Sequence, residues 1–222
     1  MTNFDCKLRA IMSRLKVLII LVFILVDSGF IKAQNFKAQA LAGMNVAQVD
    51  GDSYSGYNQP GFIGGISIYR PSKEIYNLGF ELLFSQKGSH KKNTEEDYTK
   101  FKLRYTYITM PLYIDFTDLG PDFDKVTIRA AISPNFNIIA KDNKGYGWAK
   151  TDIKPFELSG YLSIGYKIND AFGFMLRHEN SLLSIGRPAD NAYYNINRRG
   201  LYNRLVSFIF TYNLYFFAAN TC

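Results

Sequence analysis

Three residues that lie close together in the sequence, His178, Glu179 and Ser181, have the side chains of a hydrolytic site. A serine hydroxyl attacks an ester when a base accepts its proton and a third group orients that base. Successive residues of a strand point to opposite faces, and His178 and Ser181 differ in parity. A regular strand would therefore separate them, and we predict no catalytic site here. No Cys/His cluster has metal-site spacing, so we also expect no metal and no other cofactor.

A second set consists of charged residues in the predicted strands, on the faces opposite the rows of apolar side chains. It contains four acids and three bases: Glu81, Asp115, Arg129, Glu157, Lys167, Arg177 and Glu179. An isolated buried charge is very costly, so charges on an inner face must be paired or hydrogen-bonded. Because acids and bases nearly balance, we predict that these residues form a polar network in the interior. The sequence does not indicate which acid meets which base.

The elements that position both sets are strands, because apolar and polar residues alternate with a period of two. The clearest case is 204–216, where Val206 and Phe208 fall on one face and Ser207 falls on the other. Eight segments are predicted strands: 37–49, 61–69, 77–87, 102–116, 126–140, 156–168, 172–180 and 204–216. No convincing amphipathic helix follows any of them, so we expect sequential antiparallel pairing. Pro111 and Pro134 lie inside strands, and since proline removes a ladder hydrogen bond, we expect local bulges there.

The first residues have the layout of a secretory signal peptide. Positive charges precede an unbroken apolar run at 17–26, and small and polar residues follow it. This run is too short for a membrane-spanning helix, which needs about 20 residues, but it is typical of a cleaved leader. We place cleavage after Ala33, with Met1 or Met12 as the start. The predicted organisation is a signal peptide at 1–33 and one domain at 34–222.

This domain is predicted to cross a membrane with its strands, whose apolar faces would contact lipid. No apolar stretch in it reaches the length of a spanning helix, so only a closed β-barrel satisfies the backbone hydrogen bonds. Short connections (70–76, 117–125 and 169–171) alternate with long ones (51–60, 88–101, 141–155 and 181–203), as in barrels with periplasmic turns and external loops. The predicted fold is therefore all-β: an eight-stranded antiparallel up-and-down transmembrane β-barrel in the outer membrane of a Gram-negative bacterium.

Composition narrows the range of partners. Removing residues 1–33 takes away five Lys/Arg and two Asp, which lowers the formal net charge from +7 to +4. This charge is too small to indicate nucleic acid, and no basic stripe is interleaved with stacking aromatics. Aromatic residues make up 16% of the chain and suit strands and membrane interfaces. We expect contacts with outer-membrane lipid and with the barrel-assembly machinery.

Three segments together suggest a family. They are AGMNVAQVDGDSYSGYNQPGFIGG at 42–65, LGFELLFSQKGS at 78–89 and LRYTYITMPLYIDF at 103–116. The chain resembles the PorT-like family of bacterial outer-membrane β-barrel proteins, closely in its first half and by pattern in its second. The resemblance implies a barrel of about eight strands, and some relatives serve protein secretion across the outer membrane. It supplies no catalytic residues. The chain departs from the usual aromatic end of such barrels, because 218–222 follow Phe217.

Taken together, these features predict a non-enzymatic barrel with a lumen filled by side chains, which has a structural role or docks a secretion or envelope protein. The 86–100 loop, with Lys87, His90 and Lys91 before Glu95 and Glu96, would contact headgroups or a partner, or would simply be solvated. Two alternatives stay open. One is a secreted soluble barrel with an apolar interior that holds a small apolar ligand; the other is a lipid-modifying outer-membrane enzyme.

Overall fold

The computed structural model describes residues 36–52, 56–72, 75–91, 102–117, 119–143, 148–150, 153–186 and 200–214. The predicted signal peptide at 1–33 lies outside these residues. The strands are β1 (Lys37–Asp50), β2 (Gln59–Arg70), β3 (Tyr76–His90), β4 (Lys102–Thr109), β5 (Leu112–Phe116), β6 (Val126–Asn143), β7 (Trp148–Lys150), β8 (Phe156–Lys167), β9 (Phe172–Ser181) and β10 (Tyr202–Leu214). A short 3-10 helix, η2 (Pro121–Phe123), precedes β6.

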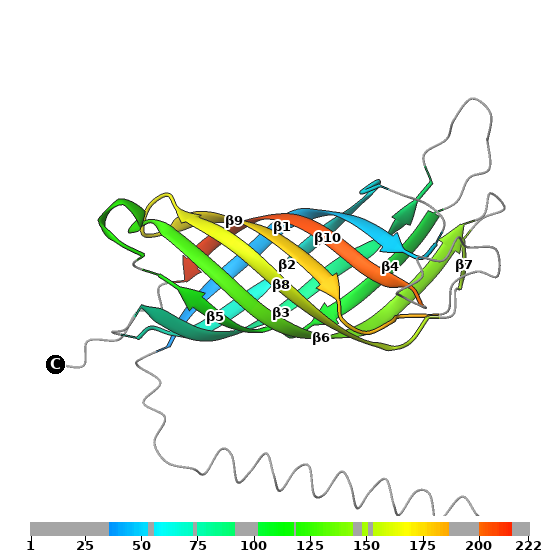
Figure 1. The fold of residues 1–222 in the computed structure, drawn as a ribbon, viewed down its shortest axis with the longest axis horizontal. Helices are drawn as coiled ribbons and strands as arrows, with labels where there is room; N and C mark the ends of the chain where they lie inside the picture. The colour runs from blue at the N-terminus through cyan, green and yellow to red at the C-terminus, as the bar shows by residue number, and fades with distance from the viewer. Residues whose placement is uncertain are drawn as a thin grey trace, which may run out of the picture. The chain divides into compact units, whose positions relative to one another are not determined.

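The sheet closes on itself to form a barrel (Figure 1). β1 pairs antiparallel with β10, from Ala38 opposite Leu214 to Asp50 opposite Tyr202. β4 and β5 share one position in the wall, since both lie between β3 and β6, and β7 only extends β6 at one end. The wall therefore has eight strands, all antiparallel, and the predicted barrel is confirmed.

The two prolines disturb the sheet less than predicted. Met110 and Pro111 separate β4 from β5, but the pairing with β6 has the same register on both sides of this break. Pro134 keeps its place in the ladder between β6 and β8. The predicted bulges at these prolines are wrong, because each proline still accepts a hydrogen bond: Pro111 from the Glu81 N–H and Pro134 from the Met110 N–H, both at 2.9 Å.

A bulge lies instead in the second half of β6. The register shifts between Thr106 and Tyr107, which lie opposite Ile139 and Asn137, so Ile138 is the extra residue. The Asn137 side-chain amide donates to the carbonyl oxygens of Thr106 (3.3 Å) and Ile139 (3.2 Å), which satisfies backbone groups at the irregularity. As a result Ile138 and Ile139 both face outward, and the inward parity of β6 changes beyond them.

The outer surface of the barrel is apolar. Met44, Leu112 and Leu162 are the most exposed of its large apolar side chains, at 63 to 66%. Along β6, exposed apolar residues run from Ile128 to Ile139, and at about 3.3 Å per residue and a tilt of about 40° this distance covers roughly 28 Å of membrane depth. Such a band matches the lipid-facing belt of outer-membrane barrels, which is about 25 Å tall.

Aromatic rings border the band at both ends. Near the short turns, the rings of Phe172 and Tyr212 have centroids 5.0 Å apart. Near the other end, Phe136 and Phe156 lie 5.6 Å apart. Aromatic side chains gather at the two membrane–water interfaces because their rings are apolar but tolerate polar surroundings.

The strand connections fall into the two predicted sets. The turns from β2 to β3, β5 to β6 and β8 to β9 lie at one end of the barrel, and β7 lies at the other end with the outer part of β4 (Figure 1). In barrels of this type the short turns face the periplasm and the longer loops face outward. No helix among the described residues is long and apolar enough to cross a membrane.

Candidate functional site: ion pairs across the lumen

Four of the predicted residues form one buried group, the arginine cluster: Glu81, Asp115, Arg129 and Arg177. Asp115 and Arg129 are direct cross-strand partners on β5 and β6. The Arg129 guanidinium donates from Nε to Oδ1 (2.5 Å) and from Nη2 to Oδ2 (2.7 Å) of Asp115, and from Nη1 to Glu81. Arg177 donates from Nη2 to both carboxylate oxygens of Glu81 at 2.9 Å. Two acids balance two bases, so the cluster has no net charge.

Both guanidinium groups of this cluster lie on tyrosine rings. The Arg129 Cζ is 3.6 Å from the ring centre of Tyr113, and the Arg177 Cζ is 3.9 Å from that of Tyr161. Tyr113 in turn covers Gly79, its register partner, where an added Cβ would lie 2.2 Å from the ring. Cation–π contacts contribute about 2 kcal/mol when they are desolvated. Glycine at 79 therefore gives the ring room to support Arg129.

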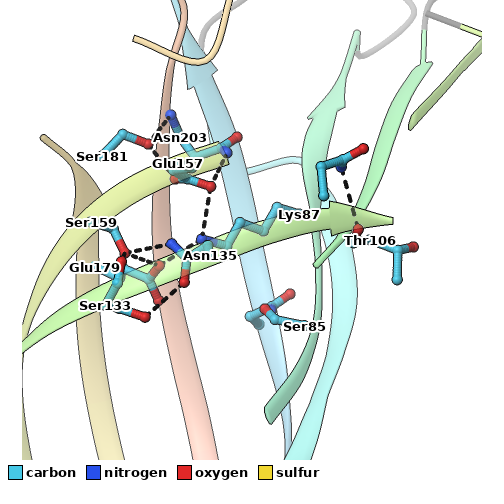
Figure 2. Close-up of polar contacts among 12 residues, drawn as sticks. Ser85, Lys87, Thr106, Ser133, Asn135, Glu157, Ser159, Glu179, Ser181 and Asn203 are labelled. Carbon is cyan, nitrogen blue, oxygen red and sulfur yellow. Dashed lines mark hydrogen bonds and ion pairs between the residues drawn. The ribbon is translucent and has the colours of Figure 1, made fainter. Parts of the chain in front are cut away.

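A second buried group, the lysine cluster, contains Lys87, Glu157 and Glu179. Figure 2 shows the Lys87 side chain reaching from β3 toward the two carboxylates. The Lys87 Nζ lies 2.6 Å from the Glu179 Oε1 and 3.3 Å from the Glu157 Oε2, and its side chain and that of Glu157 are 0% exposed. One base serves two acids, so this cluster has a formal charge of −1.

Neutral donors compensate for the excess acid of the lysine cluster. Ser181 Oγ (2.5 Å) and Asn203 Nδ2 (3.1 Å) donate to Glu157. Ser159 Oγ donates to Glu179 at 2.8 Å (Figure 2). Hydrogen bonds to a charged group are stronger than those between neutral groups, so each carboxylate is held by several donors besides the shared lysine.

The two clusters connect opposite walls of the barrel. β3 and β9 lie four positions apart in either direction around the eight-stranded wall. Glu81 and Lys87 come from β3, whereas Arg177 and Glu179 come from β9. The ion pairs Glu81–Arg177 and Lys87–Glu179 therefore cross the lumen at two levels. Eight-stranded barrels have interiors just wide enough for side chains to fill.

The structure corrects one member of the predicted network. Lys167 ends β8 at a short turn, its side chain is 53% exposed, and its Nζ lies 2.7 Å from the Asp170 Oδ1. The wall stops at this position, so a side chain of inward parity still reaches water. The hydrogen bond and the positive charge of Lys167 lower the pKa of the exposed Asp170 carboxyl.

Lys87 is a buried base that the predicted network leaves out: it is the last residue of the predicted strand 77–87, but it is grouped with the charges of the 86–100 loop. β3 continues to His90, beyond the predicted end of the strand, and Lys87 is buried. The signal that identifies it is parity, since Lys87 is an even number of positions from Glu81 and Ser85 on the same strand. The same parity rule identifies Ser159 and Ser181, which support the carboxylates.

The structure places the residues of the candidate hydrolytic site on opposite faces. His178 is exposed on the outer surface and hydrogen-bonds Asn180 at 3.0 Å. Ser181 is buried inside, where it donates to Glu157. The hydroxyl of this serine thus hydrogen-bonds a carboxylate of the ion-pair network, and His178 does not accept its proton. Among the described residues no group of three His, Cys, Asp or Glu has the arrangement of a metal site.

The orientation of the wall also excludes the soluble-barrel alternative. That fold needs a polar exterior around an apolar ligand site, whereas here the large apolar rows face outward and the paired charges face inward. A closed barrel with an apolar belt and an ionic interior defines a bacterial outer-membrane β-barrel protein.

The comparisons agree with this class. The sequence profile of the family described as outer membrane protein beta-barrel domain matches residues 32–186, and the chain belongs to this family. It is a protein of the Gram-negative outer membrane. A search of curated proteins finds no match.

Solved structures of outer-membrane barrels are similar in fold. Ail, the attachment invasion locus protein of Yersinia pestis, has a TM-score of 0.50 and 13% identity, over 80% of this chain and 99% of that chain. Neisserial surface protein A has a TM-score of 0.49 and 17% identity, over 81% and 97%. OprG from Pseudomonas aeruginosa has a TM-score of 0.40 and 10% identity, over 82% and 97%. At 13% identity, the similarity to Ail shows a shared fold alone.

Proposed function

We propose that this protein is a non-enzymatic barrel whose lumen does not conduct solutes and whose external loops are displayed for contact with a partner. The observation that carries the proposal is the pair of ion pairs across the lumen, Glu81–Arg177 and Lys87–Glu179. Each pair joins opposite walls with buried side chains, and a solute would have to break both to pass. The rigid wall then serves as a support for the loops at its outer end.

We further propose that the chain is a PorT-like barrel that acts in protein secretion, folded by the barrel-assembly machinery and working with an envelope protein. The support is that the three segments at 42–65, 78–89 and 103–116 meet inside the barrel. Asn45 of the first donates to Ser85 of the second (3.4 Å). Lys87 of the second lies 5.0 Å from the ring centre of Tyr107 of the third. Shared interior contacts give these segments one structural role.

Conductance of the purified barrel in planar lipid bilayers tests the closed lumen. We expect no stepwise conductance from the natural protein. A variant that carries both Lys87→Ala and Arg177→Ala loses both cross-lumen pairs and provides the comparison, provided that gel mobility and circular dichroism show a folded barrel. Steady conductance steps from the natural protein, as large as those of the double variant, would contradict the proposal.

Site-specific crosslinking and secretion assays test the partner. A photoreactive residue replaces Lys154, exposed at the loop end, or Lys125, exposed at the turn end. We expect an envelope protein to be captured at position 154 and not at position 125. We also expect export of secreted proteins to fail in cells without the barrel and to return when the natural chain is supplied. Normal export in cells without the barrel would rule out the secretion role.

A further inference from the structure

A strip of polar side chains interrupts the apolar outer surface on three adjacent strands, β9, β10 and β1 (Figure 1). Asn180 of β9 is the register partner of Arg204 of β10, and Arg204 is the register partner of Gln48 of β1. His178 lies two residues before Asn180, and Asp50 lies two residues after Gln48, so all five side chains have outward parity. We call these five residues the polar strip.

Hydrogen bonds and an ion pair connect the members of the polar strip within one barrel. The side chains of His178 and Asn180 hydrogen-bond each other at 3.0 Å. The Arg204 Nη2 lies 2.8 Å from the Asp50 Oδ2, and the Gln48 Nε2 donates to the Asp50 Oδ1 at 3.0 Å. His178 is nevertheless exposed, and the side chains of Arg204 and Asp50 are 40% and 27% exposed. The strip therefore presents polar groups on the surface that faces the membrane.

The deep end of the polar strip lies near the middle of the apolar band. His178 is the register partner of Leu162 on β8, which is six residues from Phe156 and four residues from Tyr166. At about 3.3 Å per residue and a tilt of about 40°, Leu162 lies roughly 15 Å from the outer aromatic level and roughly 10 Å from the level near the short turns. Lipid tails at this depth offer no hydrogen bond. An ionisable side chain placed there indicates a functional contact with another polar group.

The two sides of the polar strip are complementary in charge. His178 and Arg204 place bases on β9 and β10, and Asp50 places an acid on β1. Two copies of one barrel in the same membrane have the same orientation and depth, so the two-fold axis that relates them is the membrane normal. When this axis passes beside β10, β9 of each copy faces β1 of the other. The basic side of each strip then faces the acidic side of the other.

We propose that a second copy of this chain covers the polar strip, so that the barrel is a symmetric dimer in the outer membrane. Lipid headgroups lie beyond the edge of the apolar band and do not reach the depth of His178, whereas an identical barrel carries its polar groups at matching depths. The side chains of the strip offer both hydrogen-bond donors and acceptors, which a contact between identical surfaces requires. The dimer is independent of the closed lumen and of the loop partner.

Disulfide crosslinking of the full chain in outer membranes tests the dimer. The background variant is Cys222→Ser, because the other cysteine, Cys6, lies in the predicted signal peptide. Val206→Cys places a thiol on the outer face of β10, at the register partner of His178. Leu112→Cys places one on β5, at a position that is 63% exposed and four strands away from β10 around the wall. After oxidation we expect a product of twice the barrel mass from Val206→Cys and none from Leu112→Cys.

Adding His178→Leu and Asn180→Leu to the Val206→Cys variant tests whether the polar groups hold the two copies together. Leucine at both positions suits lipid, so the barrel should fold, and heat-dependent gel mobility checks this. We expect the crosslinked fraction to fall about 10-fold, because hydrogen bonds between membrane-spanning segments contribute a factor of about this size. His178→Gln keeps a hydrogen-bonding side chain at this depth and should retain most of the product.

Three results would overturn the dimer. The first is no product from Val206→Cys, which would assign the polar strip to a lipid or to a different protein. The second is an equal amount of product from Val206→Cys and Leu112→Cys, which would show random collision of barrels. The third is an undiminished product after His178→Leu and Asn180→Leu, which would show that the polar groups do not hold the two copies together.

Discussion

Replacing Lys87 with methionine removes the base of the lysine cluster but keeps most of the length and volume of its side chain. The Nζ of Lys87 contacts Glu179 at 2.6 Å and Glu157 at 3.3 Å, in a part of the lumen where Lys87 and Glu157 are fully buried. After the change, both carboxylates keep only neutral donors such as Ser159 and Ser181. The variant therefore leaves two buried negative charges side by side without a base.

The expected cost follows from the burial of these groups. Removing one partner of a buried ion pair costs about 3–5 kcal/mol, because the remaining charge is not compensated. We expect Lys87→Met to lower the free energy of unfolding by about 4 kcal/mol. Adding Glu179→Gln removes one of the two carboxylate charges, and Glu157 keeps its donors Ser181 and Asn203. The double variant should recover about 2 kcal/mol, within the usual range of coupling between residues in contact.

Equilibrium unfolding in urea, with the barrel folded in lipid vesicles, measures these differences. Tryptophan fluorescence and heat-dependent gel mobility follow the transition. Lys167→Met is the matched control, because it is the same substitution at a lysine of inward parity whose side chain is 53% exposed. An exposed ion pair contributes little to stability, so its unfolding curve should overlay that of the natural protein.

Two results would refute the cross-lumen pairing. The first is Lys87→Met with an unfolding curve like that of Lys167→Met. The second is a double variant, Lys87→Met with Glu179→Gln, that is less stable than Lys87→Met alone. That result would mean that Glu179 is not a carboxylate that Lys87 compensates.

Three further predictions concern other parts of the barrel. Gly79→Ala places a Cβ 2.2 Å from the Tyr113 ring, and the resulting overpacking should destabilise the barrel by about 1–3 kcal/mol in urea unfolding. Leu112→Arg puts a charge in the middle of the apolar band and should cost about 2–4 kcal/mol for a barrel folded in vesicles. Lys167→Met should raise the pKa of Asp170, measured by carbon NMR titration of its carboxyl, because the hydrogen bond and charge that lower this pKa are removed.

Each of these predictions has its own comparison. Gly160→Ala meets nothing nearer than 3.6 Å and should leave stability unchanged; equal losses at positions 79 and 160 would contradict the packing explanation. Ile139→Arg lies at the edge of the band and should cost about 0–1 kcal/mol, whereas equal costs at positions 112 and 139 would show that lipid depth does not matter. An Asp170 titration unchanged by Lys167→Met would mean that the pair does not form in solution.

Local pattern predicted most of the wall. A period of two assigns each residue to a face, and this rule alone places Glu81, Arg129 and Arg177 inside and Val206 and Phe208 outside, as in the structure. It was less reliable at strand ends. Residues of inward parity face different surroundings there, because the length of the neighbouring strands decides whether a side chain meets the lumen or water.

Lys87 and Lys167 illustrate this dependence on strand length. Both have inward parity, but β3 continues beyond Lys87 while β8 ends at Lys167. One lysine is fully buried among carboxylates, and the other is half exposed beside Asp170. The effect of the two prolines on the sheet was also overestimated. Proline removes a backbone N–H donor but keeps its carbonyl acceptor, so the ladder continues without a change of register.

The alternation of side chains by itself determined that the sheet of this chain has one apolar face and one charged face. The reason is that the local backbone of a strand decides to which face each side chain points. Only the tertiary structure decided which charges meet. Glu81 and Arg177 are 96 positions apart, and they touch because β1 closes on β10 in one register and brings β3 opposite β9. Distances across a lumen depend on strand number and stagger around the whole wall, and no single strand contains that information.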